Sequence, residues 1–230
     1  MMSDIDENIN LKESYKMKIS FLGDSITYGH CLENKADRFS SLICKQMGAE
    51  EANFGIPGTL VARAGVNRND GNSFLDRLDF VFSGDVAVIF GGTNDYFWTD
   101  TPIGDLSCGL DGFYRAVDEI CKNIKKYRNV NKTLIVTPYP HNGIGNFLGG
   151  KDYNDSTRHD TDKLNFNGHS LIDYVNVLEE IAKRYEIPVL NLHNVPGFNW
   201  KVHTSDGCHP NTEGHKWLAE QIGKAIKELL

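Results

Sequence analysis

The stretch KISFLGDS, residues 18–25, joins a short apolar run to a Gly-Asp-Ser tripeptide. Lys18 to Leu22 is typical of a first strand, which ends at Gly23. A serine at the turn from a strand to a helix has its hydroxyl at the carboxyl edge of the sheet, where outward-pointing backbone N–H groups favour negative charge. Ser25 is therefore a candidate nucleophile, although capping a helix is the commoner role of a serine when this tripeptide is taken alone.

Further short apolar runs follow this strand, and segments with helical spacing separate them. Strands are expected at Glu51 to Phe54, Val86 to Phe90, Thr133 to Thr137 and Pro188 to Leu192. Helices are expected from apolar residues at 39–47, 113–127, 171–185 and 218–229, and Gly48 is a stop signal after the first of these. Strands that alternate with helices indicate βαβ units, so we predict an α/β fold with a parallel sheet that helices cover on both faces. We expect about five strands, the usual size of a sheet.

The composition is that of an ordinary globular protein, and it argues against some classes of partner. The 230 residues are 40% hydrophobic and 24% charged, and no linker rich in Pro, Gly or Ser divides them, so we expect one domain over residues 1–230. The formal net charge of -7 offers no basic surface, which argues against nucleic acid and against an anionic membrane surface as partners. The oligomeric state does not follow from the sequence.

The N-terminal segment and the cysteines bear on the cellular compartment. Residues 1–16 form a polar, acidic extension without the apolar core of a signal peptide, and no apolar run is long enough to span a membrane. The five cysteines are scattered without a C-x-x-C pair, which argues against a disulfide framework and a thiolate zinc site. We expect a reduced, cytoplasmic protein, although a chain whose leader had been removed would look similar.

One segment lacks a clear period. Residues 139–170 follow the end of a predicted strand, where ligands bind in open α/β sheets, so we expect a long loop near the active site. The histidines at 141, 159 and 169 lie in this loop, but their spacing matches no metal site. No nucleotide-binding motif is present either, so neither a metal nor an organic cofactor is expected.

The segment DGCHPN, which begins at Asp206, supplies partners for a serine nucleophile. Asp206 and His209 are three residues apart, so local folding could bring them together. A serine hydroxyl needs an imidazole to take its proton, and the imidazole needs a carboxylate to fix its tautomer. The alternative is a turn before the last helix with an exposed histidine, and for this segment alone the turn is the simpler interpretation.

Two glycine-containing segments could supply hydrogen-bond donors at the same sheet edge. GGTND, residues 91–95, directly follows a predicted strand, and the amide of Asn94 could donate to a developing oxyanion. In NFGIPG, residues 53–58, Gly58 could bring a bare backbone N–H group close to a substrate oxygen. Plain turns explain both segments nearly as well.

Taken together, the four blocks between Gly23 and Asn211 resemble in order and spacing those of the SGNH hydrolases, also called the GDSL esterase/lipase family. The resemblance implies a three-layer α/β/α sandwich with a flavodoxin-like parallel sheet, and it implies His209 as the general base. Isoleucine stands at position 26 instead of the family's leucine, which is a conservative change. The choice of Gly58 over Gly55 follows the family's spacing. The residues that the resemblance assigns to catalysis are Ser25, Asp206 and His209, and those it assigns to the oxyanion hole are Ser25, Gly58 and Asn94.

The resemblance implies a two-step acyl transfer through an acyl-serine intermediate. We expect an esterase that acts on small or moderate acyl groups, with O-acetyl groups on a carbohydrate among the candidate substrates. A lipase, a thioesterase or an acyltransferase would use the same site, because nothing in the motifs separates water from another acceptor. A non-catalytic binding module is the competing class, and the complete residue set argues against it.

Some further residues invite functional interpretations that have simpler alternatives. Tyr96, Phe97 and Trp98 could wall an acyl pocket or stack on a sugar, but packing in the core explains each of them as well. Cys208 is not expected to act as a nucleophile, because it is not opposite the base. We expect His215 to be a surface residue of the last helix.

Overall fold

Five parallel strands form one sheet in the computed structural model, which describes residues 15–63, 72–97, 102–142, 164–165 and 167–230. The strand order is β2-β1-β3-β4-β5, and every neighbouring pair is parallel. The prediction of an α/β fold around a parallel sheet is therefore confirmed. The strands are β1 (Lys18–Gly23), β2 (Glu50–Gly55), β3 (Val86–Phe90), β4 (Thr133–Val136) and β5 (Val189–Leu190).

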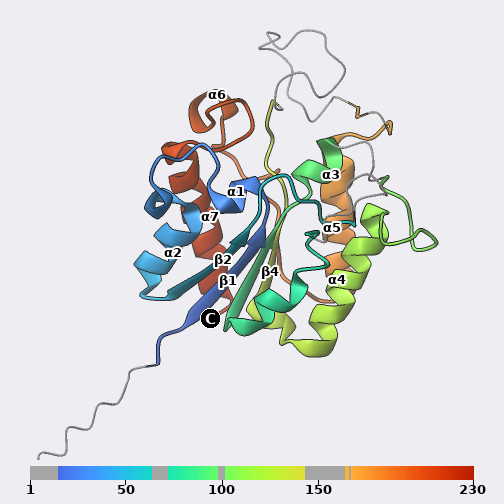
Figure 1. Cartoon of the computed structure of the whole chain (residues 1–230), viewed down its shortest axis with the longest axis horizontal. Coiled ribbons are helices and arrows are strands. Elements are labelled where there is room, and N and C mark those ends of the chain that lie inside the picture. Colours follow the sequence, from blue (N-terminus) through green and yellow to red (C-terminus); the bar gives the residue numbers. More distant parts are fainter. Residues whose placement is uncertain (1–14, 64–71, 98–101, 143–163, 166) are drawn as a thin grey trace, which may run out of the picture.

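Helices lie on both faces of the sheet, so the fold has three layers (Figure 1). Helix α2 packs against α7 on one face, and α4 packs against α5 on the other. No helix in the described part of the chain is long and apolar enough to cross a membrane. The helices are α1 (Ser25–Tyr28), α2 (Phe39–Met47), α3 (Thr93–Phe97), α4 (Phe113–Tyr127), α5 (Leu171–Arg184), α6 (Trp200–His203) and α7 (Thr212–Glu228), and the 3-10 helices are η1 (Lys35–Asp37), η2 (Leu78–Ser83) and η3 (Val130–Lys132).

The side chains of β3 alternate between two apolar clusters. Val86, Val88 and Phe90 pack with residues of α2 and α7, whereas Ala87 and Ile89 pack with residues of α4 and α5. Successive side chains of a strand point to opposite faces, so a strand covered on both sides needs apolar residues at every position. This is why β3 was predictable as one continuous apolar run.

The chain reverses its direction across the sheet next to β1. It runs outward from β1 to β2, returns to β3 on the other side of β1, and continues to β5. The last residues of β1 and β2, Gly23 and Gly55, are register partners, and Phe90 at the end of β3 also pairs with Gly23. Ligands bind at such reversals, outside the carboxyl ends of the strands. The loops that follow these three strands therefore define the place to search for a site.

The last strand is shorter than the sequence pattern predicted. The pattern covered residues 188–192, but β5 contains only Val189 and Leu190. Pro188 has no N–H group to donate to a neighbouring strand. On the other side, the side chain of Asn191 accepts a hydrogen bond from the backbone N–H of Asn194 at 3.2 Å, so a turn begins there.

His215 is buried between α7 and α2, which shows that the expectation of a surface residue was wrong. Its Nδ1 accepts a hydrogen bond from the backbone N–H of Phe39 at 3.2 Å, and its ring stacks on the Phe39 ring with a centroid separation of 6.0 Å. Burial lowers the pKa of His215 to about 3. His215 precedes Leu218 and Ile222 by three and seven residues and so shares their apolar face, a spacing that indicates burial.

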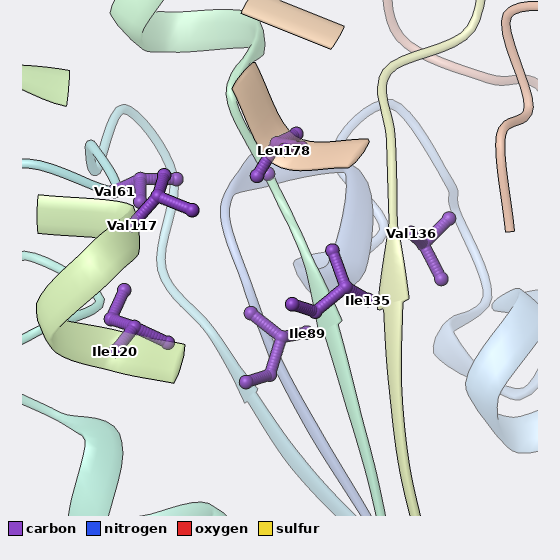
Figure 2. Close-up of a pocket in the computed structure, with 8 residues that line it drawn as sticks. Val61, Ile89, Val117, Ile120, Ile135, Val136 and Leu178 are labelled. Carbon is purple, nitrogen blue, oxygen red and sulfur yellow. The ribbon is translucent and has the colours of Figure 1, made fainter. Parts of the chain in front are cut away.

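An apolar pocket lies between the sheet and helices α4 and α5 (Figure 2). Its side chains are aliphatic, so no polar group is present to orient a ligand there. We assign this pocket to the core, and the polar residues at the carboxyl edge of the sheet remain as the candidates for chemistry. The pocket is lined by Val61, Ile89, Gly91, Val117, Ile120, Ile135, Val136 and Leu178.

Candidate active site

Ser25 is the first residue of α1, directly after the turn that leaves β1. The cap of this helix is Asp24, whose side chain accepts a hydrogen bond from the backbone N–H of Ile26 at 2.9 Å. The interpretation of Ser25 as the helix cap is therefore wrong, and its hydroxyl is available for other contacts. A Cβ on Gly55 would collide with the backbone nitrogen of Tyr28, so the glycine allows β2 to approach α1 closely.

Asp206 and His209 form a hydrogen-bonded relay with Ser25. His209 Nε2 lies 2.9 Å from Ser25 Oγ, and His209 Nδ1 lies 2.6 Å from Asp206 Oδ2. Ser25 and His209 are both buried, although they are 184 residues apart in the sequence. The imidazole thus has the serine hydroxyl on one side and a carboxylate on the other, as a general base for a serine nucleophile requires.

The Asp206 carboxylate is stabilised in its charged form. Partial burial alone would raise its pKa, but hydrogen bonds from the side chain and backbone N–H of His209 and from the backbone N–H of Cys208 lower it to about 2. A carboxylate oxygen can only accept a hydrogen bond, so the ring proton of His209 lies on Nδ1. Nε2 is then free to accept the proton of the Ser25 hydroxyl.

The loop that carries Asp206 and His209 is held by contacts outside the relay. The buried Tyr139 hydroxyl donates to the Cys208 carbonyl at 2.7 Å, and the Asn142 N–H donates to the Gly207 carbonyl at 2.8 Å. The Thr204 hydroxyl oxygen accepts from the Gly207 N–H at 3.0 Å. Tyr139 and Asn142 lie at the start of the segment predicted as a long loop, so this segment does reach the site.

Two of the three candidate oxyanion donors, Gly58 and Asn94, follow β2 and β3. Asn94 is the second residue of α3, and its Nδ2 donates one hydrogen bond to the Thr59 carbonyl at 2.9 Å. The second N–H of this amide can donate to a substrate oxygen. Gly58 has φ +75°, and no hydrogen bond among the described residues uses its N–H. The N–H of Gly55, in contrast, donates to the Asn53 side chain at 3.0 Å. The geometry therefore favours Gly58 over Gly55 as a donor to a substrate.

Arg77 is a buried residue that the sequence analysis missed. Its guanidinium donates to the carbonyls of Phe54 and Gly23, which end β2 and β1, and to the Thr59 hydroxyl at 2.9 Å. Thr59 in turn accepts from Asn94 through its carbonyl. One arginine thus links the strand that precedes Ser25 to the loop that carries Gly58. No local motif marks it, because these three partners lie 18 to 54 residues away in the sequence.

Asp95 holds the same loop from the other side. Its carboxylate accepts hydrogen bonds from the backbone N–H groups of Val61 and Ala62 at 2.9 and 3.0 Å. Burial raises the pKa of Asp95 to about 7, although these hydrogen bonds oppose the shift. The sequence analysis included Asp95 only as part of GGTND. An acidic residue directly after a buried strand was the feature that could have indicated its structural role.

The remaining candidate residues from the sequence are either buried in the core or lie outside the described residues. Tyr96, Phe97 and Cys208 are buried within the core clusters, so they do not form an open acyl pocket or present a thiol nucleophile. His141 is buried, and burial lowers its pKa to about 3. Within the predicted loop 139–170, residues 143–163 and 166 lie outside the described residues, as does Trp98.

Comparison with known proteins adds an independent observation to this geometry. A family model described as the GDSL-like Lipase/Acylhydrolase family matches residues 21–217, a segment that contains every residue of the relay and of the candidate oxyanion hole. The chain belongs to this family. The resemblance of the sequence to the GDSL esterase/lipase family is therefore confirmed, and the chain is called the GDSL family member below.

Individual relatives agree with the assignment. An acetylxylan esterase from Xylanibacter ruminicola (strain ATCC 19189) is 25% identical over 228 residues, which cover 92% of the GDSL family member and 43% of the relative. The chain thus spans less than half the length of that relative. One solved crystal structure is 26% identical with a TM-score of 0.76, covering 93% of this chain and 97% of the other. A carbohydrate acetylesterase family member from Sinorhizobium meliloti is 17% identical with a TM-score of 0.63, covering 93% and 99%, and supports the fold.

Proposed function

We propose that this GDSL family member is a serine esterase that hydrolyses carboxylic esters of small or moderate acyl groups. The observation that carries the proposal is the relay in which Ser25 Oγ, His209 and Asp206 are joined by separations of 2.9 and 2.6 Å. A hydroxyl, an imidazole and a carboxylate in this order are the groups that acyl transfer through a serine requires.

The mechanism follows from the positions of these groups. The Ser25 oxygen attacks the ester carbonyl carbon while His209 Nε2 takes the hydroxyl proton, and Asp206 stabilises the resulting imidazolium. The negative charge on the carbonyl oxygen is stabilised by the backbone N–H groups of Ser25 and Gly58 and by the Asn94 amide. His209 then protonates the leaving alcohol, and water attacks the acyl-serine in the same manner to release the acid.

O-acetyl groups on a carbohydrate are the substrates we propose within this class. The support is comparative: one relative is named an acetylxylan esterase, and one structural neighbour is a carbohydrate acetylesterase family member. The relevant test is the release of acetate from acetylated xylo-oligosaccharides. Hydrolysis of simple acetyl esters without release from any acetylated sugar would reject the carbohydrate substrate and leave the esterase assignment intact.

A chromogenic acetyl ester assay on three proteins tests the esterase proposal. We expect Ser25→Ala to reduce turnover to the uncatalysed background, while the matched control Ser83→Ala, at an exposed serine on η2, keeps the rate of the unsubstituted chain. Equal rates for Ser25→Ala and the unsubstituted chain would reject Ser25 as the nucleophile. A series of acyl lengths completes the test, because strict preference for long chains would contradict the small-acyl assignment.

A further inference from the structure

Two exposed side chains extend the site beyond the relay. His30, Cys31 and His209 each offer one metal-ligating atom, and these atoms all lie within 4.8 Å of one another. The His30 ring faces the His209 ring with a centroid separation of 4.5 Å and a tilt of 59°. His30 and Cys31 are exposed whereas His209 is buried, so the cluster joins the catalytic imidazole to side chains that solvent can reach. The mechanism proposed above uses neither His30 nor Cys31.

The backbone after α1 is bent so that these residues return over His209. Gly29 ends α1 with φ 77°, and Cys31 two residues later has φ 67°. A residue with a Cβ pays roughly 1–2 kcal/mol to adopt this left-handed conformation, which persists only where the surrounding structure imposes it. Among the described residues other than glycine, only Cys31 and Glu186 have positive φ. One of these two strained positions therefore presents a thiol beside the catalytic base.

We propose that His30, Cys31 and His209 bind a thiophilic divalent cation such as Zn²⁺, and that binding inhibits the esterase. This inference rests on the proposed function for its effect on activity, but the metal site itself does not depend on it. Two imidazoles and one thiolate are ligands that Zn²⁺ prefers, and a solvent molecule completes a four-coordinate site with three protein ligands.

The distances are close to those that a tetrahedral site needs. Zn–N bonds of about 2.0–2.1 Å and Zn–S bonds of about 2.3 Å place the ligand atoms about 3.5 Å apart. Side chains now within 4.8 Å need to approach by about 1 Å. Rotation of the exposed His30 and Cys31 side chains supplies this movement while His209 stays in place.

A cation at this position interrupts the relay whichever nitrogen of His209 it takes. Nε2 faces Ser25 Oγ and Nδ1 faces Asp206 Oδ2, so both ring nitrogens are already in use. A cation on Nε2 occupies the lone pair that accepts the serine proton, and a cation on Nδ1 displaces the carboxylate that orients the ring. The Cys31 thiol loses its proton to solvent when the thiolate binds, and no oxidation or reduction is involved.

Neighbouring charges set the strength of binding. The Asp206 carboxylate favours a cation near the three ligands. The Lys35 ammonium opposes it, because its Nζ donates to the Gly29 carbonyl at 2.6 Å and acts electrostatically on both His30 and Cys31. We therefore expect affinity below that of a closed structural zinc site, and inhibition that a chelator reverses.

The experiment titrates tag-free protein with Zn²⁺ while it measures bound metal by equilibrium dialysis and activity on a chromogenic acetyl ester. We expect one bound Zn²⁺ per chain, loss of activity in parallel with binding, and full recovery with EDTA. Cys31→Ser and His30→Gln should keep their activity without metal but need at least about tenfold more Zn²⁺ for inhibition, a loss of about 1.4 kcal/mol in binding. The matched control Cys108→Ser, at a partly exposed cysteine outside the cluster, should respond as the unsubstituted chain does.

Ser25→Ala separates failure of this inference from failure of the proposed function. This variant removes the hydroxyl that competes for His209 Nε2, so it should bind Zn²⁺ at least as tightly as the unsubstituted chain although it has no activity. Binding of Co²⁺ with the absorption of a thiolate-to-metal charge transfer, lost in Cys31→Ser, identifies the thiolate ligand without any substrate. Absence of stoichiometric binding, or binding unchanged in both Cys31→Ser and His30→Gln, would overturn the inference.

Discussion

Asn94 has one amide N–H that binds within the protein and a second that we propose for the oxyanion. One of its Nδ2 hydrogens is committed to the Thr59 carbonyl at 2.9 Å, and this contact fixes the direction of the other. The side chain is buried, so the fixed donor does not compete with bulk water. A donor oriented before the substrate arrives stabilises charge in the transition state without reorganisation.

We therefore expect Asn94→Ala to lower kcat by about 100-fold to 1000-fold, with a much smaller change in KM. The physical reason is that the lost hydrogen bond matters only when the carbonyl oxygen becomes negative. Steady-state kinetics on an acetyl ester measures both constants, and circular dichroism on heating shows that the variant is folded. A kcat within twofold of the unsubstituted value would remove Asn94 from the oxyanion hole.

At the scale of secondary-structure elements, single buried polar side chains hold distant segments together. Arg77 joins the ends of β1 and β2 to the loop after β2, and His215 joins α7 to the first turn of α2. Arg77 donates to backbone carbonyls at the ends of two strands, and His215 accepts from the N–H of Phe39, in the first turn of α2, where N–H groups have no partner within the helix. These contacts lie at the ends of strands and helices, where the loops that carry the site residues begin.

Replacing Arg77 by lysine tests the first of these contacts. Lysine keeps the positive charge but has a single amino group, which cannot reach Gly23, Phe54 and Thr59 together. We expect Arg77→Lys to lower the free energy of unfolding by about 3 kcal/mol, because buried acceptors lose charged donors. We also expect kcat to fall more than KM rises, since Thr59 positions Asn94. Urea unfolding and steady-state kinetics measure the two effects, and unchanged kcat in a destabilised variant would limit Arg77 to stability.

His215→Gln tests the second contact through its dependence on pH. Burial lowers the pKa of His215 from 6.5 to about 3 in the folded state, so its stabilising contribution is complete above about pH 6.5 and is lost as the pH falls towards 3. We expect the substitution to cost more free energy of unfolding at pH 7.5 than at pH 5. Urea unfolding of both proteins at the two pH values measures the difference. The same cost at both pH values would contradict a neutral, buried imidazole in the native protein.

The sequence predicted most elements because their signals are local. The bounds of β3 and α4 follow from uninterrupted apolar or helical spacing, and α2 ends before Gly48, which was predicted as a stop signal and has φ 64°. The relay residues lie in short motifs, and their order along the chain was visible. Arg77, His30 and the burial of His215 were not predicted, because each depends on contacts between segments far apart in the sequence.

At the scale of the whole molecule, the sheet separates two apolar layers. We expect each layer to contribute independently to the free energy of unfolding. Ile181 on α5 belongs to one layer and Ile222 on α7 to the other, and both are fully buried. The relay residues Ser25, His209 and Asp206 belong to neither apolar cluster. The site lies at the edge of the sheet, between the two layers. Both layers must therefore be folded before Ser25 can contact His209.

We expect Ile181→Ala and Ile222→Ala each to lower the free energy of unfolding by about 2–5 kcal/mol, because each leaves a cavity in its layer. The double variant should show the sum within about 0.5 kcal/mol, because the sheet separates the two sites. KM for an acetyl ester should not change in either single variant. Urea unfolding checks the energies, and a double-variant cost well below the sum would indicate that the layers are coupled.

The distance of 184 residues between Ser25 and His209 also has a consequence for protein synthesis. A ribosome exposes the nucleophile and the first strands long before it adds the base, and β5 must be made before the loop of Asp206. The nascent chain is therefore catalytically silent until all five strands of the sheet have been translated. The appearance of ester hydrolysis during translation in a cell-free extract would mark the moment at which the C-terminal segment docks.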